Sequence, residues 1–235
     1  MKYYKIEIKS RYPDFDRISS SAEGKDIEDS EYYFRKMDEG EVINDAPIFD
    51  YFYLESFDKK QYWEWQLNDA FDFIGQGSQI PGWLISNKLK KIFETFNIAK
   101  PHFYYPSKLL YKEKKLDYYI FQFSGKQFRQ PLTNHINFSK SLFYNPNNNL
   151  DFSVENEKEL LTMQEKILED SGFNIINVPI KILLLNKDID FISMQNFLGD
   201  NIVSERLKQA IEENGITGFE FSELNYEVVV EAHHR

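Results

Sequence analysis

Four histidines, at positions 102, 135, 233 and 234, are the only imidazoles of this 235-residue chain, which contains no cysteine. Transition-metal sites rely heavily on these two residue types, and two ligands share a helical face at a spacing such as i and i+4. The histidines lack that spacing. The missing cysteine also excludes a disulfide framework, an iron–sulfur cluster and a thiolate nucleophile. His102 follows a proline among aromatic residues, and we interpret it as an edge-of-core residue rather than a catalytic base.

Short motifs for other chemistry are incomplete. Asp188 and Asp190 resemble the start of a calcium loop, but Ser193 and Gly199 stand where that loop requires Gly and Glu. Residues 75–80 begin like a dinucleotide-binding loop and lack its third glycine. The chain has no Gly-x-Ser-x-Gly turn and no phosphate-binding loop. We therefore predict no catalytic residue, no metal and no cofactor, and interpret the chain as a non-enzyme.

Residues 100–129 interleave aromatic side chains with lysines. Aromatic rings that stack on bases beside lysines that meet phosphates would follow such a pattern. A pair of strands with an inward aromatic face and a lysine-rich turn follows it equally well, and we favour that second interpretation.

Two other aromatic stretches stand beside acidic residues, at positions 31–34 and 63–65. Tyrosine and tryptophan are frequent anchors of protein–protein interfaces, although the core of a sheet would also use them. On this basis Tyr32, Tyr33, Trp63 and Trp65 are candidate anchors for a partner. The acidic segment 14–58 adds Glu28 and Asp29, which makes six nominated residues.

The elements that must position these residues follow from periodicity and turn residues. A helix is expected after the cap residue Ser86, with Leu89, Ile92, Phe93 and Phe96 inward. Two more are expected, one at 154–170 with Leu161 inward and one after Ser204 up to Asn214. Residues 19–30 are expected to form an exposed loop. The expected strands are 2–9, 48–54, 61–66, 117–123, 175–176, 180–185, 189–192, 217–221 and 227–230.

This order lacks a regular βαβ rhythm and predicts an α+β fold with mixed or antiparallel sheets and about three helices. We expect a single domain over 1–235, with 145–149 as the boundary if two lobes exist, 1–145 and 150–235.

Residues 84–98 align without gaps on residues 202–216. Ser, Leu, Lys, Glu and Ile recur 118 positions apart, beginning with Ser86 and Ser204. The echo predicts a duplicated unit in which a strand leads into a Ser-capped helix.

The net charge of −10 is unevenly distributed. Residues 14–58 hold 14 acidic and 4 basic residues, and residues 151–235 hold 17 acidic and 7 basic residues. The middle segment, 59–150, is basic, with 6 acidic and 13 basic residues. These segments either neutralise one another or leave an acidic face that attracts a basic partner. An acidic chain is a poor general binder of nucleic acid. No apolar run is long enough to span a membrane, and we expect a soluble, cytoplasmic protein.

Residues 203–221 read Val-Ser-Glu-Arg-Leu-Lys-Gln-Ala-Ile-Glu-Glu-Asn-Gly-Ile-Thr-Gly-Phe-Glu-Phe. This segment resembles the C-terminal signature of a family of predicted immunity proteins from bacterial polymorphic-toxin systems, formerly catalogued as a domain of unknown function. Residues 83–90 and the opening strand are also similar to the corresponding parts of that family. The acidic segment 14–58 and the lysine-rich turn 108–115 depart from it.

The resemblance implies a non-catalytic, cytoplasmic protein that binds and neutralises the toxin domain of a cognate bacterial toxin. A basic toxin would suit the acidic segments, with the six nominated residues in contact. Two alternatives remain open: a small hydrolase or nucleic-acid-processing enzyme that uses the basic aromatic segment 100–129, and a nucleic-acid-binding module on the same segment. The oligomeric state is not predicted.

Overall fold

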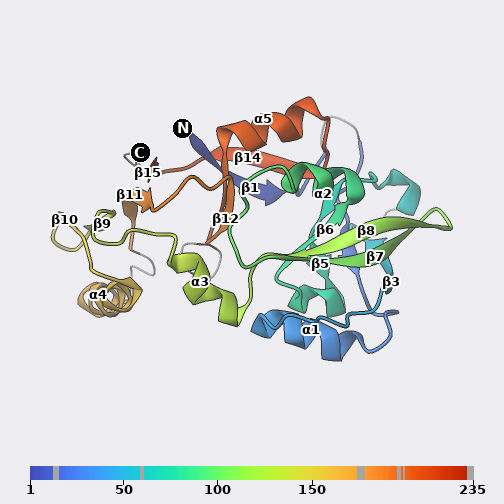
Figure 1. Ribbon diagram of the computed structural model, residues 1–235, viewed down its shortest axis with the longest axis horizontal. Helices are drawn as coiled ribbons and strands as arrows, with labels where there is room; N and C mark the ends of the chain where they lie inside the picture. Colours follow the sequence, from blue (N-terminus) through green and yellow to red (C-terminus); the bar gives the residue numbers. More distant parts are fainter. Residues whose placement is uncertain (13–15, 59–60, 174–177, 195–196, 198, 232–235) are drawn as a thin grey trace.

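The computed structural model describes residues 1–12, 16–58, 61–173, 178–194, 197 and 199–231. Within these residues the chain forms three sheets and five α-helices (Figure 1). The predicted α+β class is confirmed, whereas the count of about three helices is too low. The two additional helices are α1 (Ser30–Glu39), whose aromatic residues suggested a sheet, and α3 (Arg129–Thr133), which is too short to show a period.

A seven-stranded sheet organises the first two thirds of the chain, in the order β4-β6-β8-β7-β3-β2-β5. The strands are β4 (Ala70–Phe71), β6 (Gly82–Ser86), β8 (Lys114–Gln122), β7 (Phe103–Tyr111), β3 (Phe49–Glu55), β2 (Ser21–Glu23) and β5 (Phe73–Ile74). The turn between β7 and β8 consists of Lys112 and Glu113, both at positive φ, as a tight two-residue hairpin requires. The strand-pair interpretation of residues 100–129 is thereby confirmed.

A second sheet has the order β12-β13-β1-β14, with β12 (Phe191–Ser193), β13 (Asn201–Ser204), β1 (Tyr3–Ile8) and β14 (Phe219–Glu223). Helices α2 (Asn87–Phe93) and α5 (Glu205–Glu213) touch each other beside these two sheets. One buried cluster joins both sheets to both helices, and its largest members include Trp83, Phe93, Phe121 and Phe191.

The third sheet, β10-β9-β11-β15, contains β10 (Leu150–Phe152), β9 (Leu142–Asn145), β11 (Ile180–Leu185) and β15 (Glu227–Val230). Helix α4 (Glu157–Asp170) contributes Leu160 and Ile167 to the core that also holds the residues of this sheet. Leu161, which we expected to point inward, is exposed. The turn at 145–149 forms the β9–β10 hairpin, while the division into two lobes at this point stays a prediction.

Two local predictions are wrong. Within 19–30, β2 pairs with β3 and Ala22 is fully buried, because a short strand between two others is stabilised by partners distant in sequence. Residues 61–66 are not a strand. Tyr62–Glu64 form a 3₁₀ turn, and only Trp65 makes a single bridge, to Ile18. Residues 175–176 lie outside the described residues.

Four strands of the large sheet, β4-β6-β8-β7, repeat the arrangement of the second sheet, β12-β13-β1-β14. The order and the antiparallel pairing are the same in both. In each, the second strand leads into a helix whose N-cap serine accepts from the third residue beyond it, Ser86 from Leu89 and Ser204 from Leu207. The predicted unit therefore occurs twice. The repeated unit is larger than the segment that repeats in the sequence, because β1, from the start of the chain, completes the second copy.

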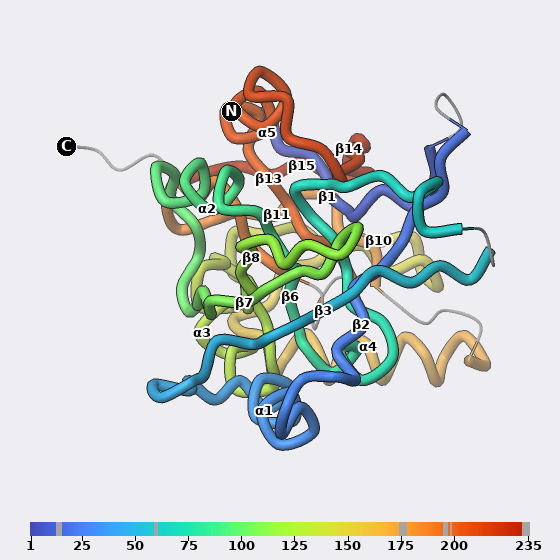
Figure 2. The backbone as a smooth tube through the Cα atoms, turned by 90° about the vertical axis from the view of Figure 1, so that its right-hand side faces the viewer, coloured from blue at the N-terminus to red at the C-terminus, as the bar shows by residue number. Residues whose placement is uncertain are grey.

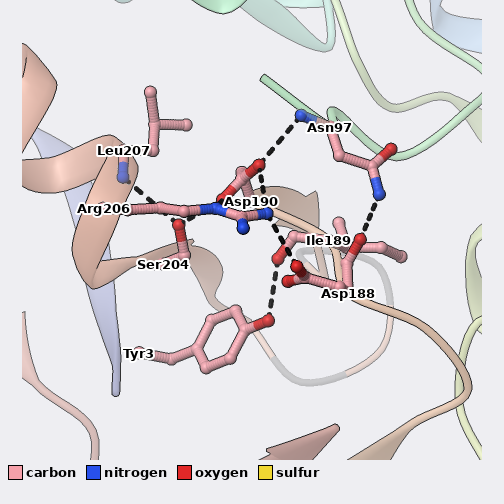
Figure 3. Close-up of polar contacts among 8 residues, drawn as sticks. All are labelled: Tyr3, Asn97, Asp188, Ile189, Asp190, Ser204, Arg206 and Leu207. Atoms are coloured by element: carbon pink, nitrogen blue, oxygen red, sulfur yellow. Dashed lines mark hydrogen bonds and ion pairs between the residues drawn. The ribbon is translucent and has the colours of Figure 1, made fainter. Parts of the chain in front are cut away.

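An aspartate in each unit also bonds to the other unit. Asp190 accepts from the Ser204 hydroxyl (2.6 Å) and from the backbone N–H of Asn97 (2.9 Å), which follows α2 (Figure 3). The guanidinium of Arg206 reaches the same carboxylate through two nitrogens, Nε and Nη2. Only 2% of the Asp190 side chain is exposed, so this carboxylate is a buried charge surrounded by donors.

Asp69, in the first unit, accepts the corresponding hydrogen bonds from its own unit and from the second unit. It accepts from the Ser86 hydroxyl (2.6 Å) and from the backbone N–H of Thr217 (3.0 Å), which follows α5. Each aspartate therefore binds the cap serine of its own unit and the chain after the helix of the other. The two units are interlocked, because separating them would remove from each carboxylate the backbone N–H that the other unit donates.

A tyrosine hydroxyl makes an equivalent hydrogen bond within each unit, beside the aspartate. Tyr3 donates to the carbonyl of Ile189 (2.8 Å), and Tyr118 donates to the carbonyl of Asn68 (2.6 Å). Each acceptor immediately precedes the aspartate of its unit. Burial raises the pKa of both hydroxyls, which keeps them protonated and able to donate.

We expect Asp190→Asn to lower the free energy of unfolding by about 3 kcal/mol, because it leaves the Arg206 and Ser204 donors around a neutral amide in a buried site. Asp69→Asn should cost less, about 1–2 kcal/mol, since Asp69 is partly exposed. Asp151→Asn removes only the surface pair with Lys181 and should change stability by less than about 0.5 kcal/mol. Urea unfolding of the three variants checks this order. Equal losses at Asp190 and Asp151 would contradict the interlock.

Candidate functional site

The six nominated residues lie in two places. Glu28, Asp29, Tyr32 and Tyr33 surround the start of α1, at the lower edge of the molecule in Figures 1 and 2. Trp63 and Trp65 belong to the segment beside the end of the β7–β8 hairpin. The six nominated residues therefore form two separate groups.

At the start of α1, Glu28 and Asp29 are exposed, and neither forms an ion pair with a described residue. Asp29 adopts a left-handed conformation (φ 53°), which Asp and Asn tolerate better than most residues. Tyr32 is 48% exposed, with the Lys36 ammonium 5.0 Å from its ring centre. The acidic patch, as we name Glu28, Asp29, Glu31 and Tyr32, borders a shallow hollow.

Tyr33 is less exposed than the adjacent Tyr32. Its side chain is half-buried and packs edge-on against the fully buried Phe49, with ring centres 5.5 Å apart. The ring therefore belongs mainly to the core, and this nominated residue offers a partner less surface than Tyr32.

A pocket with a volume of about 240 Å³ lies beside the tip of the β7–β8 hairpin. Four aromatic and two aliphatic residues line it, with Lys112 and Glu113 at the hairpin turn. We call it the aromatic pocket, and its apolar lining is Tyr53, Leu54, Tyr62, Trp65, Leu110 and Tyr111.

The two tryptophans have different positions relative to this pocket. Trp65 lines it and packs against the core of the large sheet, and its carbonyl accepts from the Tyr111 hydroxyl at 3.0 Å. Trp63 is 55% exposed and packs edge-on against Tyr62. Phe57 is also highly exposed nearby in the sequence. The two tryptophans therefore differ: Trp65 is held in the pocket, whereas Trp63 lies largely exposed and contacts Tyr62.

The indole nitrogen of Trp65 is buried and has no hydrogen-bond acceptor among the described residues. A buried donor left unpaired costs about 1–3 kcal/mol relative to a paired one.

Sequence analysis missed Tyr53, Tyr62 and Tyr111 as members of this site. Tyr62 is adjacent to Trp63, so the aromatic run itself was a usable signal. Tyr53 and Tyr111 join the pocket because β3 and β7 are neighbours in the sheet, and no spacing in the chain predicts that pairing.

The acidic and basic segments partly neutralise each other. Lys115 pairs with Asp50 at 2.7 Å, and Lys126 pairs with both Asp38 (3.2 Å) and Glu39. In the second acidic segment, Glu157 pairs with Arg129 at 2.6 Å. The acidic surface is therefore smaller than the sequence blocks suggest, and the patch at the start of α1 is one part of it that stays unpaired.

The alternative sites for chemistry are not assembled. No group of three or more His, Asp or Glu residues within the described part of the chain could hold a metal ion. His102 packs edge-on against Tyr104 and Phe121, and its Nδ1 lies 3.0 Å from the carbonyl oxygen of Ala99. Lys108 and Lys126 of the basic segment are engaged in ion pairs. His233 and His234 lie outside the described residues.

We expect the two tryptophans to differ in their effect on stability. Trp65→Ala should lower the free energy of unfolding by about 2 kcal/mol, because it removes half-buried packing, whereas Trp63→Ala should change it by less than about 0.5 kcal/mol. Urea unfolding followed by circular dichroism measures both. A loss of stability at Trp63 equal to that at Trp65 would show that Trp63 is not free for a partner.

Burial lowers the pKa of His102, and that of His135, below the usual value of 6.5. The unfolded chain then binds protons more readily, so their contribution to stability is complete above pH 6.5 and is lost as the pH falls toward the folded pKa values. His102→Asn keeps a donor near Ala99 and removes the titration. The stability of this variant should fall less than that of the unmodified protein between pH 7 and pH 5. Parallel pH profiles would contradict the assignment.

Comparison with known proteins bears on the C-terminal part of the chain. Residues 136–230 match the model of the immunity protein family Imm11. No curated protein sequence matches the chain. Among the described residues, no helix is long and apolar enough to cross a membrane. The resemblance to an immunity protein family is thereby confirmed, and residues 136–230 of this chain are similar to the family Imm11.

Proposed function

We propose that this protein is a non-catalytic immunity protein of the cytoplasm that binds and neutralises the toxin domain of a cognate bacterial toxin. The match of residues 136–230 to the family Imm11 carries this proposal. Two surfaces suited to a protein partner, the acidic patch and the aromatic pocket, support it.

The matched segment and the nominated surfaces occupy different parts of the molecule. The segment 136–230 contains β9 to β15 with α4 and α5 and thus supplies the third sheet and much of the second. The acidic patch and the aromatic pocket belong to residues 25–113, outside the match. We propose that the matched segment is the common scaffold, and that the first half of the chain recognises the particular toxin.

Lys25 lies between the two nominated surfaces. It lines the hollow beside the acidic patch, and its ammonium lies 5.1 Å from the ring centre of Tyr53, which lines the aromatic pocket. A partner that filled the pocket could therefore also reach the start of α1. The acidic patch would speed the encounter with a basic toxin domain, and the aromatic residues would slow its dissociation.

The first experiment is a pull-down of the tagged protein from its native cell lysate, with mass spectrometry of the bound chains. Co-expression of the captured toxin domain with this protein in a toxin-sensitive strain then tests protection. One stoichiometric partner whose toxicity is suppressed supports the proposal. A captured domain that kills equally well in the presence of this protein would refute it.

Removing charge from the acidic patch should slow association with a basic toxin. In Glu28→Gln with Asp29→Asn, the asparagine still tolerates the left-handed backbone at position 29, so the fold is not strained. We expect the association rate constant to fall about three- to tenfold at low salt and its salt dependence to flatten, with little change in dissociation. Stopped-flow fluorescence at several ionic strengths measures both rates.

The matched control is Glu169→Gln with Asp170→Asn, which removes two charges from the exposed end of α4, far from α1 along the molecule (Figure 1). The control should leave the association rate within about twofold of the unmodified protein, because charges beyond a Debye length are largely screened. Equal slowing in both variants would mean that net charge, and not the patch, steers the encounter.

A further inference from the structure

The edge of the third sheet is open at β15. This strand, Glu227–Val230, is the last in the order β10-β9-β11-β15 and pairs in parallel with β11 only. An edge strand exposes a row of unpaired backbone donors and acceptors, and many proteins protect such an edge with charge, proline or a covering segment. Val228 of this strand is buried in the core, whereas Val229 and Val230 are partly exposed and Glu227 is exposed.

The direction of the backbone groups follows from one hydrogen bond. The N–H of Glu231 donates to the carbonyl of Leu185 in β11 at 2.8 Å. Because successive residues of a strand point their backbone groups to opposite sides, Glu227 and Val229 also face β11. The N–H and C=O groups of Val228 and Val230 therefore face away from the sheet, and no described residue pairs with them.

An open groove of about 440 Å³ runs along this edge. All residues from Glu227 to Glu231 line it, and Met1 and Asp188 form its remaining lining. Successive side chains of a strand point to opposite faces of the sheet, so a groove lined by five consecutive residues follows the backbone edge rather than one face. Its position is the one that an added strand would occupy.

The charges at the two ends of β15 distinguish a second copy of this chain from a strand of another protein as the occupant of the groove. The Glu227 carboxylate is exposed and has no ion-pair partner among the described residues, whereas Glu231 is already paired with Lys140. A second copy of this chain, added antiparallel about Val229, would place the Glu227 of each copy opposite Glu231 of the other, and like charges directly opposite are destabilising. A strand with basic residues at its ends would instead complement this edge.

We propose that the β15 edge is a strand-addition site that takes an extended, apolar segment with basic flanks from another protein. Backbone hydrogen bonds to Val228 and Val230 give the binding energy, and Glu227 favours the basic flank. The site lies at the end of the molecule opposite the tip of the β7–β8 hairpin, so it and the aromatic pocket can be occupied together (Figure 1). The inference rests on the sheet edge and not on the identity of a toxin.

Synthetic peptides test the site directly on the full-length protein. The probe is acetyl-Lys-Val-Thr-Val-Lys-amide, with acetyl-Glu-Val-Thr-Val-Glu-amide as the acidic counterpart. In NMR hydrogen exchange, saturating basic peptide should slow the amides of Val228 and Val230 at least about tenfold and leave Val229 unchanged, because the latter already bonds to β11. Binding of both peptides with equal affinity, or no slowing at these amides, would overturn the proposal.

Two variants make the result specific. Val230→Pro removes an outward N–H and keeps the bonds to β11, as edge strands tolerate, so it should abolish peptide binding while β11 remains protected. Glu227→Lys should reverse the preference and favour the acidic peptide. Retained binding in the proline variant would contradict backbone pairing. Concentration-dependent protection of the same amides without peptide would instead assign the edge to a second copy of this chain.

Discussion

Two aspartates, each of which accepts hydrogen bonds from both strand–helix units, join the centre of this protein. Asp190 and Asp69 each accept from the serine that caps the helix of their own unit and from the chain that follows the helix of the other unit. A buried carboxylate is tolerated only when donors surround it, so these contacts fix both the helix starts and the packing of one unit on the other. The second sheet, α2, α5 and the strands on which α2 rests all take their positions from these hydrogen bonds.

The surfaces proposed to bind partners lie away from this centre. The aromatic pocket is at the tip of the β7–β8 hairpin, the acidic patch is at the start of α1, and the β15 edge is at the opposite end (Figure 1). A central interlock that tolerates little change leaves the periphery free to vary without loss of the fold. This arrangement suits a protein that keeps one scaffold and changes its partner, as the proposed immunity function requires.

The caps of the two helices in the strand–helix units could be predicted from the sequence. The repeat of Ser86 at Ser204 predicted both helix caps, since an N-cap acts on residues only two or three positions away. The repeated lysine and glutamate, Lys90 with Glu94 and Lys208 with Glu212, form i,i+4 pairs in both helices. Such contacts are local, and the spacing of residue types contains them.

The sequence by itself determined the α+β class, the capped helices, the strand pair within 100–129 and the immunity-family resemblance, because each depends on neighbouring residues or a contiguous motif. Only the tertiary structure decided that β1 completes the second unit, that Tyr53 and Tyr111 share a pocket with Trp65, and that β15 is an open edge. The reason is physical. In these cases strand order and burial are set by contacts between segments more than forty residues apart, and the periodicity of one segment carries no information about which partner it meets.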